Sequence, residues 1–248
     1  MGFFSRLGKA LGAKAPTAAP APVPVQAPST RRVGGSIGHF DLEQWWFEEL
    51  SDADRQLIRA RYQPMGMPAN HDSLTDGSDI SSSETTALWL MTLAGWFKPA
   101  DPQEADLILR IAEKAWQVKD VLAPSKGAEA IFSRHLALGR LSETYYRFRE
   151  NPTYLERSLE AARLQIAMQK DAAAAWKQQE IDLARMIGSP VPKDITLPSH
   201  QGFKRMAIVL EKDKQFDQAL TLVREAKASG WSGDWDKCIE RLKKKLSK

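Results

Sequence analysis

The chain has little cysteine, no long apolar run and none of the short motifs that mark common catalytic sites. Its 248 residues contain a single cysteine, Cys238, which excludes an internal disulfide and a zinc site built from several cysteines. No apolar stretch approaches the roughly 20 residues that cross a bilayer. A glycine-rich phosphate loop, a nucleophile elbow and a dinucleotide fingerprint are also missing. These absences favour a non-enzymatic protein in a reducing compartment, and we expect it in the cytoplasm.

Metal-binding spacings are missing as well. None of the four histidines stands at a zinc-ligand distance from another ligand. We therefore predict no catalytic residue, no metal and no cofactor. His135 is expected at a helix surface or partly buried, and His200 just before a helix, where it contributes to the N-terminal turn.

A long polar segment, residues 63–83, is rich in glycine, proline, serine and aspartate. Its aspartates, from Asp72 onward, are spaced by four and then three residues, whereas calcium loops place ligands at alternate positions. Aspartate and glycine are typical of turns, which we expect here. A long loop in a compact domain is either functional or disordered. An alternative is therefore a helical enzyme whose site combines this loop with Trp45 and Trp46.

Acidic side chains are absent from residues 1–40, which carry five basic ones. Residues 234–248 carry six basic and three acidic side chains, so the net charge of +4 resides in the two ends and the body is mildly acidic. This distribution argues against a broad basic face on the folded body, and nucleic acid is not the expected partner. The alternative is a nucleic-acid-associated protein that uses both basic ends and binds less tightly as salt rises.

The first residues combine apolar and basic side chains. The apolar ones share one helical face: Phe3, Phe4, Leu7 and Leu11. Such a helix contacts anionic membrane surfaces, so these are the expected membrane-contact residues; the other interpretation is a frayed tail. The segment resembles the short amphipathic targeting helices of bacterial peripheral membrane proteins. A peripheral location at the inner membrane face is therefore a further expectation.

A proline- and alanine-rich stretch follows. Residues 15–30 hold five of the 14 prolines, which predicts an extended linker that spans up to about 50 Å. The expected organisation is an N-terminal helix or tail (1–14), a disordered linker (15–38), a helical N-terminal subdomain (39–125) and a second helical subdomain with a C-terminal capping helix (126–248).

Apolar residues recur at helical spacing through the body, and no convincing run alternates with period two, so the predicted fold class is all-α. Asp41 is expected to cap the first helix, Ser51 with Asp54 to form a capping box, and 188–200 to be irregular. The predicted helices cover 41–50, 52–63, 84–98, 102–121, 127–150, 153–170, 172–187, 201–213, 216–229 and 235–246.

Residues 203–226 carry the most informative spacing. Large and small residues alternate on two short helices at fixed offsets: Phe203, Met206, Ala207, Leu210, Ala219, Val223 and Ala226. This pattern resembles the tetratricopeptide repeat, although Trp231 stands where proline often ends the repeat. A weaker match covers 140–168, and the basic C-terminal helix resembles a capping helix. The resemblance implies an α-α superhelix in the C-terminal half.

In that family the first helix of each pair lines a concave groove that holds a partner. Members that grip a C-terminal carboxylate use a lysine and an asparagine four residues apart; Lys204 fits, but Ile208 replaces the asparagine. The resemblance therefore implies a protein or peptide partner, in an adaptor or scaffold role. A structural subunit of a larger assembly is an alternative, and the oligomeric state stays open. The implied groove residues are Gln201, Lys204, Ile208, Glu211 and Lys212, with Arg140, Glu143 and Arg147 from the weaker match.

Overall fold

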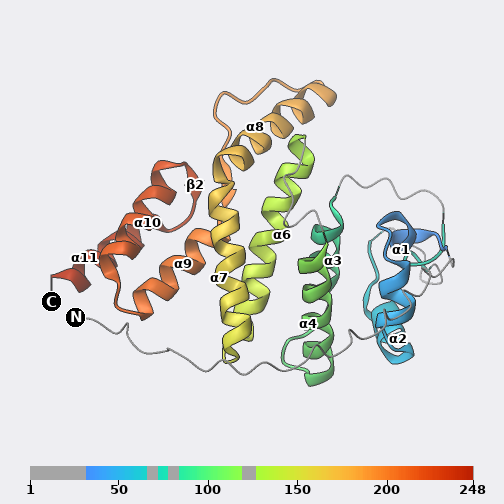
Figure 1. Cartoon of the computed structure of the whole chain (residues 1–248). Coiled ribbons are helices and arrows are strands. Elements are labelled where there is room, and N and C mark those ends of the chain that lie inside the picture. The colour runs from blue at the N-terminus through green and yellow to red at the C-terminus, as the bar shows by residue number, and fades with distance from the viewer. Residues whose placement is uncertain (1–31, 66–71, 78–83, 119–126, 248) are drawn as a thin grey trace, which may run out of the picture. The chain divides into compact units, whose positions relative to one another are not determined.

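The computed structural model describes residues 32–65, 72–77, 84–118 and 127–247, and these are helical almost throughout (Figure 1). The predicted all-α class is confirmed. The predicted N-terminal helix and linker, up to residue 31, lie outside the described residues. The elements are α1 (Gly35–His39), the π-helical turn η1 (Trp45–Glu49), α2 (Asp52–Arg61), α3 (Thr86–Ala94), α4 (Pro102–Gln117), α6 (Ala128–Arg147), α7 (Pro152–Ala167), α8 (Gln169–Met186), β1 (Leu197–Ser199), α9 (Gln201–Lys212), α10 (Phe216–Ala228), β2 (Trp231–Ser232) and α11 (Trp235–Leu246).

Several helix starts coincide with local sequence signals. The predicted capping box is present at α2, where the Ser51 hydroxyl accepts from the Asp54 amide and the Asp54 carboxylate accepts from the Ser51 amide. Pro102 and Pro152 occupy the first turns of α4 and α7, where a missing amide proton costs nothing. These ends are set within a few residues of chain, which is why the sequence locates them.

The last residues of the predicted linker are folded. The amide of Gly35 donates to the carbonyl of Gly77 (2.8 Å), and the amide of Ile37 donates to the carbonyl of Leu74 (2.9 Å). Ile37 and Leu74 are both buried. Gly35 has φ +60°, and a Cβ there would lie 2.5 Å from the Leu74 carbonyl carbon. The linker boundary at residue 38 was therefore placed too late.

The predicted helix 41–50 is present over a shorter range: residues 43 and 44 are α-helical, and Trp45–Glu49 continue as a π turn. Asp41 has φ +53° and caps no α-helix, and the amide of Leu50 donates to the carbonyl of Trp45 (3.2 Å). The wider turn lets the adjacent Trp45 and Trp46 both enter the core, where they are 2% and 0% exposed. The burial of two neighbouring indoles therefore favours a π turn over regular α-helical geometry at these residues.

Successive helices pack as pairs (Figure 1): α3 with α4, α6 with α7, and α9 with α10. Each pair also contacts the next, since α4 packs on α6, α7 packs on α9, and α10 packs on α11. The first helix of each pair also contacts the first helix of the next pair: α3 packs on α6, and α6 packs on α9. Helix α8 lies outside this succession and packs on α6. The described chain therefore contains packed helix pairs of the kind that helical-repeat folds use.

Two hydrophobic clusters form the core. One surrounds α3, α4 and α6, and the other surrounds α9, α10 and α11. Gln165 of α7 joins α6 to α9: its Nε2 donates to the carbonyl of His135 (2.9 Å), and its Oε1 accepts from the amide of Gly202 (2.6 Å). Helix α6 contributes to both clusters, and the described residues belong to one compact unit. The division into subdomains at residue 125 stays a prediction.

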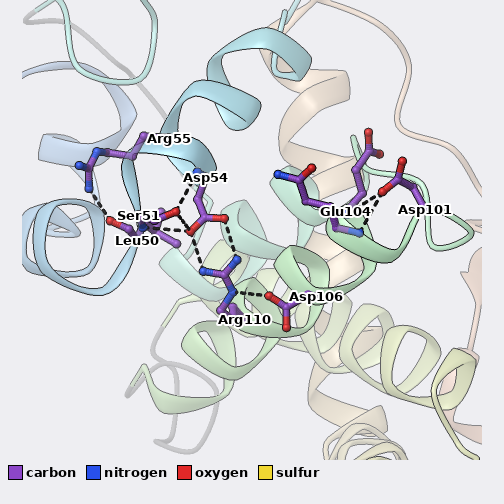
Figure 2. Close-up of polar contacts among 9 residues, drawn as sticks. Leu50, Ser51, Asp54, Arg55, Asp101, Glu104, Asp106 and Arg110 are labelled. Carbon is purple, nitrogen blue, oxygen red and sulfur yellow. Dashed lines mark hydrogen bonds and ion pairs between the residues drawn. The ribbon is translucent and has the colours of Figure 1, made fainter.

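Helix α2 is joined to α4 by buried carboxylates. Figure 2 shows Asp54 of α2 facing Arg110 of α4, whose Nη1 and Nη2 each donate to one carboxylate oxygen at 2.7 Å. Arg61 donates to Glu104 (2.6 Å), which also accepts from the amide of Lys98. In both pairs the carboxylate is buried while the guanidinium reaches the surface. Ion pairs thus fix the position of α2.

One short parallel pairing interrupts the helical pattern. Leu197 of β1 pairs with Trp231 of β2, and the hydroxyl of Ser232 donates to the carbonyl of Leu197. Segment 188–200 was expected to be irregular, so this strand is a correction. Leu197 is 3% exposed, and its burial requires backbone partners that a free loop lacks. The pairing closes the loop before α9 against the loop after α10.

Candidate functional site

The described surface is hollowed between α9 and α11. The hollow has a volume of about 530 Å³, and its floor is apolar while its rim carries charges. We call it the α9–α11 hollow. Its lining is Lys204, Ala207 and Ile208 from α9, with Gly233, Asp234, Trp235, Cys238 and Arg241.

Local contacts orient the two helices that form the hollow. His200 caps α9 through its Nδ1, which accepts from the amide of Phe203 (3.3 Å), as the sequence predicted. Phe203 is fully buried and fixes the inner face of α9. At the start of α11 the indole nitrogen of Trp235 donates to the carbonyl of Trp231 (2.6 Å). These anchors leave Ile208 39% exposed on the side of α9 that faces the hollow.

Ion pairs organise the rim. Glu211 of α9 accepts two hydrogen bonds from Arg241 of α11 (3.0 and 2.9 Å) and pairs with Lys245 (2.8 Å). The hydrogen bond from Arg241 lowers the pKa of Glu211 below its ordinary value. Lys204 has no ion pair with any described residue. The hollow therefore offers one cation with no partner of its own.

We expect Glu211→Gln to lower the free energy of unfolding by about 1 kcal/mol, because two partly exposed cations lose their shared carboxylate. Urea unfolding measures this loss, which should shrink as salt screens the pairs. Glu240→Gln is the matched control, since Glu240 is exposed on α11. Equal effects of the two substitutions would contradict the assigned role of Glu211.

The structure brings together part of the predicted groove. Lys204 and Ile208 both line the α9–α11 hollow. Gln201 is half-buried in the first turn of α9, outside the lining. Glu211 was expected to face a partner, but it binds α11 instead. Intramolecular pairing across helices is invisible to a repeat pattern, which places residues on a face and not against a neighbour.

Arg140, Glu143 and Arg147 line a separate hollow of about 310 Å³ between α3, α4 and α6. Arg140 donates to the hydroxyl of Thr92 on α3, and Arg147 donates to Glu143 (3.1 Å). The predicted groove residues of α6 therefore do not share a hollow with those of α9. Lys212 connects the two helices, since its Nζ donates to the hydroxyl of Tyr146 on α6 (3.0 Å).

Sequence reasoning missed the contribution of α11. Trp235, Cys238 and Arg241 line the hollow, although α11 was interpreted only as a capping helix. The sequence did contain a signal for this contact. Arg241 and Lys245 lie four residues apart on one helical face, where two like charges repel each other unless an acidic side chain of a neighbouring element lies between them. Cys238 is half-buried at the edge of the second cluster.

Two histidines lie inside the protein. His135 and His200 are 1% and 0% exposed, with ring centroids 4.8 Å apart, and His135 stacks on Trp231 (4.9 Å). Burial lowers the pKa of His135 to about 4 and that of His200 to about 3. The prediction of a surface or partly buried His135 was wrong, because stacking and the contact with Gln165 Nε2 (3.3 Å) draw the ring inward. Their burial favours a structural role for both rings.

The features invoked for an enzyme serve packing in the described residues. Trp45 and Trp46 are core residues. Asp72 accepts from the amides of Leu74 and Thr75, which confirms its predicted role in a turn. No three metal-binding side chains of the described ranges lie close enough to hold an ion.

The predicted membrane-contact residues lie outside the described ranges: Phe3, Phe4, Leu7 and Leu11. Within those ranges no helix combines the length and apolarity needed to cross a bilayer. Contact through the N-terminal segment therefore stays a prediction.

Comparison with protein-family models gives no match, and neither do comparisons with curated proteins and with solved structures.

Proposed function

We propose that this protein is a non-enzymatic interaction module that holds a segment of a partner protein in the α9–α11 hollow. The observation that carries the proposal is the hollow itself, with an apolar floor, the exposed Ile208 and Lys204, which has no ion pair within the described part of the chain. Open apolar hollows with a few polar groups are typical of binding sites. A partner side chain that covers Ile208 would remove apolar surface from water, which favours binding.

The packing order supports a tetratricopeptide-like arrangement as part of the proposal. In such arrays the first helices of successive pairs line one face. Here α3, α6 and α9 contact one another in that order, and α11 follows after α10. Helix α8 between the second and third pairs departs from a regular array. We propose an irregular superhelix whose last two first-position helices, α9 and α11, form the binding face.

The N-terminal segment adds a second element to the proposal. A basic amphipathic helix on a long linker would tether the module to an anionic membrane surface or to a second partner. The tether would raise the local concentration of the module near its partner without adding contacts to the hollow. This part rests on sequence composition alone.

A peptide-display selection against the purified protein tests the hollow. We expect the selected peptides to bind Ile208→Glu at least about tenfold more weakly, a loss of about 1.4 kcal/mol, because a carboxylate would replace the apolar contact. Ile208 is partly exposed, so its replacement leaves the core intact. Dissociation constants measured by isothermal titration calorimetry give the comparison.

Leu183→Glu is the matched control, because Leu183 is 46% exposed on α8 and does not line the hollow. It should leave the affinities unchanged. Peptides that bind both variants as tightly as the wild type would reject the hollow as the binding site, as would a selection that enriches no peptide.

A further inference from the structure

Three cations surround one tyrosine where α6 meets α9. The guanidinium carbon of Arg205 lies 3.7 Å from the ring centroid of Tyr146, and that of Arg149 lies 4.7 Å from it. The ammonium group of Lys212 donates to the tyrosine hydroxyl (3.0 Å). We call Arg149, Arg205 and Lys212 around Tyr146 the Tyr146 cation cluster. Cation–π contact explains why the ring attracts them, but it adds no negative charge.

Nearby acids do not balance the cluster. Glu143 attracts Arg205 electrostatically, but its carboxylate accepts a hydrogen bond from Arg147 (3.1 Å). Glu150 lies 3.9 Å from Arg149 and is almost fully exposed, so this ion pair is long and well solvated. Of the four cations at this junction, Arg147 and Arg149 each have an ion pair, with Glu143 and Glu150. Arg205 and Lys212 have none with any described residue.

Arg205 has no ion pair with any described residue, although Glu143 and Tyr146 attract its guanidinium electrostatically. Its Nε is buried and has no hydrogen-bond partner among the described residues. Burial lowers the pKa of Arg205 below its ordinary value. Arg205 also lies in the second turn of α9, where the helix dipole does not stabilise a cation as it does near the C-terminus. Its partly desolvated positive charge still attracts an anionic oxygen beside the cluster, although the buried Nε itself is out of reach of a partner.

The cluster borders the α9–α11 hollow. Arg205, Ile208 and Lys212 stand at positions i, i+3 and i+7 of α9, so they form one stripe along the helix. Ile208 lines the hollow between the two cations of the stripe, and Lys204 lines it one turn earlier. A segment that covers Ile208 would therefore pass cations at both ends of its contact.

We infer that the Tyr146 cation cluster binds side-chain carboxylates of the partner segment that occupies the α9–α11 hollow. The partner segment is then acidic on both sides of an apolar residue. This inference rests on the proposed function and adds the chemical class of the partner. Carboxylates beside a buried apolar contact would set the position of the segment along α9 and raise its association rate.

Two blocked peptides test the inference: acetyl-EELFEE-amide and acetyl-QQLFQQ-amide. Because both C-termini are amidated, only side-chain carboxylates differ. We expect the acidic peptide to bind the wild type at least about tenfold more tightly, with an advantage that shrinks at about 0.3 M salt. The Nε–Hε NMR signal of Arg205 should shift with the acidic peptide only.

The variant Arg149→Gln with Lys212→Gln should abolish the preference for the acidic peptide while leaving the affinity for the glutamine peptide unchanged. Arg224→Gln with Lys243→Gln is the matched control, since both side chains are exposed and neither lines the hollow. This control makes the same change in net charge and should keep the preference.

Equal binding of the two peptides, or a preference that survives in the cluster variant, would overturn the inference. So would cluster-dependent binding of phosphatidylglycerol vesicles or of a single-stranded oligonucleotide without any peptide preference. If uncharged peptides from the display selection still depend on Ile208 in that case, the hollow remains the binding site and the role of the cluster is rejected. A preference that persists in Ile208→Glu would reject the hollow and keep the cluster as an anion site.

Discussion

Acidification from about pH 7 to about pH 5 is expected to remove about 4 kcal/mol from the free energy of unfolding, through two histidines. The buried rings of His135 and His200 have pKa values lowered to about 4 and about 3. In the unfolded chain both titrate near the ordinary value of 6.5. The unfolded state therefore binds protons that the folded state excludes, and each histidine costs about 1.4 kcal/mol per pH unit below that value.

The sign and the pH window follow from these shifts. Stability is complete above the unfolded pKa of 6.5 and is lost as the pH falls, until the folded histidines protonate at about 4 and about 3. The carboxylates with lowered pKa, such as Asp54 and Glu211, lose their contribution only below their own ordinary values of 3.8 and 4.5. The interval between about pH 6.5 and pH 5 therefore reports on the histidines.

Urea unfolding across this interval measures the effect. The double variant His135→Phe with His200→Asn should lose most of the slope, because phenylalanine keeps the stack and asparagine keeps the cap on α9. Each single variant should lose about half of it. His39→Gln is the matched control, since His39 is exposed, and it should retain the slope. Imidazole NMR signals of His135 or His200 that titrate near 6.5 in the folded protein would contradict this prediction.

The sequence predicts those features whose causes are local. The capping box at Ser51 and the prolines that begin α4 and α7 fix helix ends within a few residues, so periodicity and capping locate the helices well. The structure confirms the all-α class for the same reason. The π turn at Trp45 and the short strand at Leu197 were missed, because both depend on burial against distant residues.

In the candidate site, too, local features were predictable and long-range contacts were not. Lys204 and Ile208 both line the α9–α11 hollow, as helical spacing allows, and their role in partner binding stays a prediction. The partners of that face were not predictable: Glu211 pairs with α11, and Lys212 bonds to Tyr146 of α6. Such pairings join residues tens of positions apart. Only the packing of the helix pairs brings them together.

Helix α2 gives the second large expected effect. Arg110→Ala should lower the free energy of unfolding by about 3 kcal/mol, because it leaves the buried Asp54 carboxylate without its bidentate partner. Asp54 is buried to 6% side-chain exposure, and only Ser51 would still donate to it. The hydrogen bonds from Arg110 are the main reason that the pKa of Asp54 lies well below its ordinary value.

A double-mutant cycle separates loss of the pair from loss of packing. Asp54→Asn keeps an oxygen for the Ser51 amide but removes the charge, so its combination with Arg110→Ala should be more stable than Arg110→Ala alone. Arg163→Ala is the matched control, since the pair of Arg163 with Glu156 is exposed on both sides. That substitution should cost less than about 1 kcal/mol.

Hydrogen exchange should locate the damage in Arg110→Ala. Asp54 and Arg61 both bind α4, and the first of these links is lost in the variant. We therefore expect faster deuterium uptake in Asp52–Arg61 than in α9, because an opening of α2 leaves the hollow intact. Peptides selected on the wild type should bind the variant unchanged. Equal acceleration of exchange in α2 and α9 would show instead that the ion pair supports the whole unit.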